Sequence, residues 1–198
     1  MKEIPIIFNS EMIRAILGGR KTQTRRPIKP QPVYKFKHLE EGLGYKASEG
    51  NLYAGFYEEG TSGMYVKCPY GKVGDRLWVR ETFCEVSLGA ELRYKATDKK
   101  PAIQNWKPSI HMPRWASRIT LEITDVRVER LKEIKPDDCL KEGIIVDRKL
   151  DKMFSKKEIN ESTILCFWGL WHLIYGKTEY NWDINPWVWV IEFKRLDK

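Results

Sequence analysis

The residues best suited to chemistry in this chain lie close together, directly after a double glycine near the N-terminus. Lys21 stands three residues before Thr24. The cations that flank these two residues are Arg20, Arg25 and Arg26. Such a group can bind an anion. A lysine that is removed from water can instead act as a base and activate a hydroxyl as a nucleophile.

The spacing of apolar residues predicts the elements that hold this segment in place. A helix is expected over 9–17, and the double glycine allows it to end there. Pro27 is expected to stop regular structure after the basic segment. The other predicted elements are a strand over 4–8, a strand starting at 77, a strand over 118–128, a short helix over 136–141, a long helix over 156–175 and a strand over 187–196.

These elements indicate an α+β class. The strands outnumber the helices and long loops separate them, which favours a small β-barrel with peripheral helices over a doubly wound sheet. A chain of 198 residues is expected to form one domain, over 1–198. A hydrophobic content of 42% with eight tryptophans is enough for a core.

The positive charge is concentrated near the N-terminus. The formal net charge is +8, and residues 1–37 hold nine Lys or Arg against two Glu. This concentration favours a partner that carries phosphates, such as RNA or a nucleotide. A solvated basic face is the alternative.

Several classes of protein are not expected. The four cysteines form no C-x-x-C pair and predict free thiols in a reducing cytoplasm. No apolar run approaches the ~18 residues of a membrane span, and no signal peptide is visible. No histidine or carboxylate set has metal-ligand spacing, and no phosphate loop is present, so neither a metal nor a cofactor is predicted. The oligomeric state is not fixed by the sequence.

Aromatic residues allow two interpretations. Five tryptophans fall in regions expected near the mouth of the barrel, where they could stack on a base or pack in the core. They are Trp106, Trp115, Trp182, Trp187 and Trp189. Trp168 and Trp171 lie on or near the apolar face of the long predicted helix and are expected in the core.

Four segments in this order resemble the ASCH domains, small barrels similar to the RNA-binding fold of pseudouridine synthases and archaeosine transglycosylases. The first is the glycine-lysine-threonine-arginine signature that runs from Ile16 to Arg26. The others are Gly-Asp-Arg-Leu-Trp-Val at 74–79, Thr-Leu-Glu-Ile-Thr at 120–124 and Trp-Val-Ile-Glu-Phe-Lys at 189–194.

The resemblance implies a PUA-like barrel with additions. The chain particularly resembles the elaborated members found in phages and prophages. The stretches at about 28–66, 86–115 and 147–180 are then insertions or extensions of the minimal domain.

One branch of this family hydrolyses the acetyl amide of N4-acetylcytidine with a lysine, a threonine and a glutamate. The matching positions are Lys21, Thr24 and Glu142. The resemblance implies that Thr24 is the nucleophile, Lys21 its base and Glu142 the proton relay or orienting group. Burial and neighbouring arginines favour a neutral Lys21, whereas Glu142 favours the charged form.

Substrate or nucleic-acid contacts are expected from cations and one aromatic residue near this site. They are Arg20, Arg25, Arg26, Arg76, Arg80, Arg114 and Trp115. One alternative is a non-catalytic module that binds RNA or a nucleotide, with Lys21 charged. Another is a ribonuclease that uses the same cleft.

Overall fold

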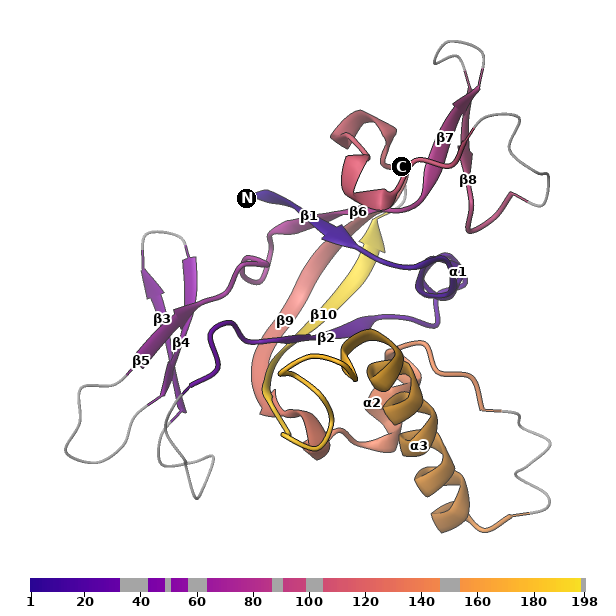
Figure 1. Ribbon diagram of the computed structural model, residues 1–198. Coiled ribbons are helices and arrows are strands. Elements are labelled where there is room, and N and C mark those ends of the chain that lie inside the picture. Colours follow the sequence, from indigo (N-terminus) through magenta and orange to yellow (C-terminus); the bar gives the residue numbers. More distant parts are fainter. Residues whose placement is uncertain are drawn as a thin grey trace.

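The computed structural model describes residues 1–32, 43–48, 51–56, 64–86, 91–98, 105–146 and 154–196. The main element is a five-stranded sheet in the order β1-β6-β9-β10-β2 (Figure 1). Its strands are β1 (Glu3–Ile7), β6 (Arg76–Arg80), β9 (Thr120–Arg130), β10 (Trp187–Leu196) and β2 (Gln23–Pro27). β1 runs parallel to β6, and the other neighbouring pairs are antiparallel.

Three helices accompany this sheet. They are α1 (Ser10–Leu17), α2 (Pro136–Lys141) and α3 (Lys156–Tyr175). The Asn9 side chain caps α1, and Ser155 and Glu158 form a capping box at the start of α3. α2 and α3 lie side by side near β2 (Figure 1). The three helices predicted from the sequence are confirmed.

Smaller elements fall in the stretches that the sequence marks as insertions. β3 (Leu43–Ser48), β4 (Asn51–Phe56) and β5 (Met64–Lys67) form a three-stranded antiparallel sheet. β7 (Phe83–Val86) and β8 (Glu91–Tyr94) form a hairpin. Two short 3-10 turns, η1 (Ser109–His111) and η2 (Arg114–Ala116), lie at the end of the second stretch, and a third, η3 (Leu131–Glu133), follows β9 outside these stretches. Residues 33–42, 49–50, 57–63, 87–90, 99–104 and 147–153 lie outside the described residues.

The two faces of the main sheet bury different clusters. Side chains of β10 alternate between the faces, as they do in any strand. Trp189 and Ile191 face the main core together with residues of β1, β6 and β9. Val188 and Val190 face the opposite side, where Phe167 and other α3 residues pack against them. α3 is therefore packed against the sheet through the second cluster.

The α+β class is confirmed, with more strands than helices. Among the described residues, β1 and β2 form the two edges of the sheet and do not pair with each other, so no closed barrel is formed. None of the helices described is long and apolar enough to cross a membrane.

One element was not predicted from the sequence, and one expectation needs correction. Residues 23–27 of the basic segment pair with β10 as the edge strand β2, and this strand ends at Pro27, where regular structure was expected to stop. Proline is tolerated there because it occupies the last position of an edge strand. Trp168 was expected in the core but is 38% exposed, because α3 turns Phe167 and Trp171 inward instead.

Candidate active site at the end of α1

Lys21 is positioned by a tight turn that ends α1. Gly19 has φ = 71°, in the left-handed region that glycine tolerates best. The backbone N–H groups of Arg20 and Lys21 both donate to the carbonyl of Ala15, at 2.9 and 3.1 Å. This turn folds Lys21 back against α1 and buries its side chain completely.

Glu142 reaches the same place from the end of α2. The chain turns away at Gly143, where φ is 95° and an added Cβ would lie 2.9 Å from the Cβ of Ala15. Only glycine allows this close approach between the end of α2 and α1. The N–H of Thr22 donates to the carbonyl of Lys141 at 2.9 Å, which ties the two segments together.

Lys21 and Glu142 form a buried ion pair. The Lys21 Nζ atom lies 2.7 Å from Oε2 of Glu142 and donates to the Glu142 backbone carbonyl at 2.8 Å. Glu142 is only 4% exposed. We call these two residues the Lys21 pair.

Burial lowers the pKa of Lys21 below the ordinary value of a lysine, because the charged ammonium has lost its hydration. The carboxylate of Glu142 opposes this shift through its charge and its hydrogen bond. The positive charges of Arg26 and Arg25 lower the pKa further. Burial dominates, so the environment favours the neutral amine more than water does.

Arg25 belongs to a second buried ionic group beside the pair. Its guanidinium lies 2.9 Å from Glu129, 3.2 Å from Asp138 and 3.5 Å from Glu142. Arg127 contacts Glu129 at 2.5 Å and Glu192 at 2.8 Å on the same face of the sheet. We call Arg25, Arg127, Glu129, Asp138 and Glu192 the Arg25 network.

Thr24 lies on β2 and is 2% exposed. It lines a small cavity of about 20 Å³ together with Glu142 and side chains of α3. Within the described residues, the Thr24 hydroxyl has no hydrogen-bond partner. The cavity has room for about one water molecule. The structure thus brings Lys21 and Glu142 into contact and places Thr24 at a cavity that Glu142 shares.

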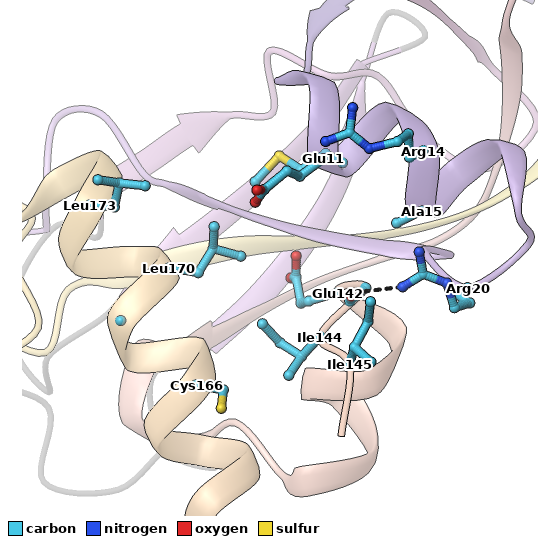
Figure 2. A pocket seen from close by; sticks show the side chains of 13 residues that line it. Glu11, Arg14, Ala15, Arg20, Glu142, Ile144, Ile145, Cys166, Leu170 and Leu173 are labelled. Atoms are coloured by element: carbon cyan, nitrogen blue, oxygen red, sulfur yellow. Dashed lines mark hydrogen bonds between the residues drawn. The ribbon is translucent and has the colours of Figure 1, made fainter. Parts of the chain in front are cut away.

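A larger pocket of about 560 Å³ opens outward from Glu142. Arg14 and Arg20 stand on the α1 side of this pocket, and Leu170 and Leu173 of α3 stand opposite, with Glu142 between them (Figure 2). We call it the outer pocket. Met12, Glu142 and Leu170 line both the outer pocket and the Thr24 cavity, so they separate the two. A further pocket of about 590 Å³ lies between α2 and α3, and Arg20 borders it as well.

The other predicted residues of the basic segment have different roles. Arg20 is exposed at the rim of the outer pocket and donates to the Gly143 carbonyl at 3.3 Å. Arg26 lines the Thr24 cavity and donates to the Ile7 carbonyl at 2.7 Å. Arg25 was predicted to contact substrate or nucleic acid; its guanidinium is buried among carboxylates, and that contact stays a prediction.

The remaining predicted contact residues do not line the pockets beside Glu142. Arg80 donates to two backbone carbonyls, and Arg114 pairs with Glu3 at 2.9 Å. Arg76 is half-buried on β6, and Trp115 is 63% exposed on η2. Their contacts with nucleic acid stay predictions. Arg14 was not predicted as a site residue, although it lies one helical turn before the double glycine and therefore beside the same segment.

In the described part of the chain, no group of three or more His, Cys, Asp or Glu side chains is arranged so that it could hold a metal ion. Comparisons with models of known protein families, with curated proteins and with solved structures found no match for this chain.

Proposed function

We propose that this protein is an ASCH-type amidohydrolase that cleaves the acyl amide of an N4-acetylcytidine-like nucleoside. The observation that carries the proposal is the burial of Lys21 against Glu142, beside a cavity that Thr24 lines. A buried lysine with a lowered pKa is a recognised way to obtain a base near neutral pH.

The arrangement of the main sheet supports a PUA-like fold. α1 connects the two edge strands, β1 and β2, on the side where a barrel would close. The Arg26 side chain crosses this gap and donates to the carbonyl of Ile7 at the end of β1. The proposed fold is a partly open barrel whose seam contains the site.

The hydrogen bonds of Lys21 suit a neutral amine. A neutral amine has two N–H donors and one lone pair, whereas an ammonium has three donors and none. Lys21 Nζ donates twice, to the carboxylate and to the carbonyl of Glu142. No third oxygen acceptor for it is found among the described residues, and the ring of Phe8, with its centroid 5.7 Å from Nζ, is the remaining neighbour that would favour an ammonium. The lone pair of a neutral Lys21 is then left to accept a proton.

In the proposed reaction, Thr24 Oγ1 attacks the acyl carbonyl carbon while its proton passes to Lys21, directly or through one water in the cavity. The C–N bond breaks, and the amine leaves with the proton from Lys21. Water then attacks the acyl ester on Thr24, which releases the carboxylic acid and restores the hydroxyl. Glu142 orients Lys21 and relays the proton.

Arg26 is suited to stabilise the oxyanion that forms in both steps. Its Nε atom is buried without a hydrogen-bond partner among the described residues, and the residue lines the Thr24 cavity. Its guanidinium is held over the ring of Phe8, 5.3 Å from the ring centroid. A fixed donor that is unused before the reaction is what oxyanion stabilisation requires.

The substrate must approach through the outer pocket, because the Thr24 cavity is too small for a nucleobase. Met12 and Leu170 stand between the two spaces, and a methionine side chain adapts readily to a ligand. In this proposal the acyl group enters between them, while the rest of the nucleoside stays in the outer pocket.

The alternatives suggested by the sequence have less support. A phosphate-binding module needs exposed cations, yet Lys21 and Arg25 are buried and paired. Such a module would bind single-stranded RNA with an affinity that falls steeply with salt. A ribonuclease would release shorter fragments from the same RNA.

The experiment that tests the proposed function is incubation with N4-acetylcytidine, followed by chromatography for cytidine. Wild-type protein and the Thr22→Val variant are expected to release cytidine, since Thr22 is exposed. Thr24→Val is expected to lose turnover. Absence of turnover by the wild type, or equal turnover by Thr24→Val, contradicts the proposal.

A further inference from the structure

The arginines of the outer pocket differ from the other arginines around Glu142. Arg25 and Arg127 each contact several carboxylates. Arg14 and Arg20 form no ion pair with a described residue. Arg14 donates to the Ala96 carbonyl at 3.0 Å, and Arg20 donates to one carbonyl. Both keep donors for a ligand.

The rest of the outer pocket is mainly apolar. Ile144 and Ile145 follow α2, and Leu170 and Leu173 come from α3 across the opening (Figure 2). A volume of about 560 Å³ falls within the usual range for a pocket that holds a small molecule. The pocket therefore combines a cationic wall, an apolar wall and the carboxylate of Glu142 at its inner end.

We infer that the outer pocket holds a nucleoside monophosphate, with its phosphate on Arg14 and Arg20. The guanidinium groups supply paired N–H donors that match phosphate oxygens. The base and sugar lie against the apolar wall, and the acyl group points inward past Met12 and Leu170. This inference rests on the proposed function, and it changes the substrate from a nucleoside to its 5′-phosphate.

The charges favour one phosphate over a nucleic-acid strand. Glu11 also lines the outer pocket and offsets part of the positive charge. The remaining cations of the basic segment are buried or engaged, so no continuous basic surface extends from the pocket along residues 20–26. A strand would need further phosphate contacts beyond this pair of arginines.

Cys166 offers a direct report of occupancy, without any need for turnover. It is exposed and lines the outer pocket, whereas Cys68, Cys84 and Cys139 are buried. A thiol reagent is therefore expected to modify Cys166 first. A ligand in the pocket protects it, and the protecting concentration gives the affinity.

The experiment compares protection of Cys166 by cytidine 5′-monophosphate, by cytidine and by a short single-stranded RNA. The monophosphate is expected to protect at a concentration about tenfold lower than cytidine, because charge-assisted hydrogen bonds are added. Arg14→Gln and Arg20→Gln are expected to remove this preference. Lys157→Gln, which removes one exposed cation on α3, is expected to keep it.

Two results would overturn the inference: equal protection by cytidine and its monophosphate, or tighter protection by the RNA. Neither result depends on catalysis. Protection by the monophosphate without hydrolysis of an acetylated ligand would defeat the proposed function and leave the phosphate site intact. Hydrolysis of N4-acetylcytidine without a preference for phosphate would do the reverse.

Discussion

The Lys21 pair and the Arg25 network are neighbouring ionic groups that meet at Glu142, yet they differ in the number of carboxylates around the buried cation. Arg25 is surrounded by three carboxylates, and a guanidinium keeps its proton at any ordinary pH. Lys21 has one carboxylate and an amine whose proton can leave. A buried cation surrounded by several carboxylates therefore stabilises the fold. A buried cation with a single carboxylate can instead take part in chemistry.

The largest effect is expected from removing the amine of the Lys21 pair. Lys21→Met should lower turnover of N4-acetylcytidine by on the order of 10²–10⁴, the usual contribution of a general base. Lys141→Met is the control, because Lys141 is an exposed lysine one residue before Glu142. Circular dichroism checks that Lys21→Met is folded. Wild-type turnover by the folded variant would show that the Lys21 pair has no more of a catalytic role than the Arg25 network.

The Arg25 network should matter for folding instead. Arg25→Met removes a buried partner of Glu129, Asp138 and Glu142, of which Glu129 keeps Arg127 and Glu142 keeps Lys21, and should reduce the free energy of unfolding by about 1–3 kcal/mol. Arg114→Met breaks an exposed pair with Glu3 and should cost about 0–1 kcal/mol. Urea denaturation measures both. Equal losses in the two variants would show that the network does not stabilise the fold in this way.

The shared carboxylate allows a test by pH. Glu142→Gln keeps a similar shape but removes the charge that raises the pKa of Lys21. Since the base must be neutral, activity rises as pH passes the Lys21 pKa. The rising limb of residual activity should therefore move to lower pH. A limb that stays in place, or moves to higher pH, argues that Lys21 is not the titrating base.

The smallest effect concerns the boundary between the two cavities. Leu170→Ala should widen access to the Thr24 cavity and raise the kcat/KM for bulkier acyl groups, relative to acetyl, roughly tenfold. Leu165→Ala is the matched control on the same helix, because Leu165 is 62% exposed and lines neither the outer pocket nor the Thr24 cavity. Rates with an N4-acetyl and an N4-benzoyl substrate give the ratio. An unchanged ratio in Leu170→Ala places the acyl group elsewhere.

Local patterns in the sequence predicted most of the helix ends that position the site. The end of α1 at the double glycine, the whole of α3 and the glycine after α2 follow from caps and apolar spacing. Strand β2 did not, because its state depends on pairing with β10 more than 160 residues later. The same holds for Arg25, whose partners come from β9 and α2 and cannot be read from its neighbours.

The contact between Lys21 and Glu142 was expected only through the family resemblance, since nothing local links two residues 121 positions apart. The size of the Thr24 cavity was not predictable either. It depends on how α3 packs beside β2, and α3 lies in a stretch that the resemblance marks as an insertion.

The central claim is that Lys21 loses its proton more readily than other lysines of this chain. NMR titration of the lysine side chains, with the Lys21 signal assigned by its absence in Lys21→Met, measures this directly. We expect the pKa of Lys21 to lie below the usual lysine value of about 10.4. A Lys21 that stays protonated together with the exposed lysines would contradict it.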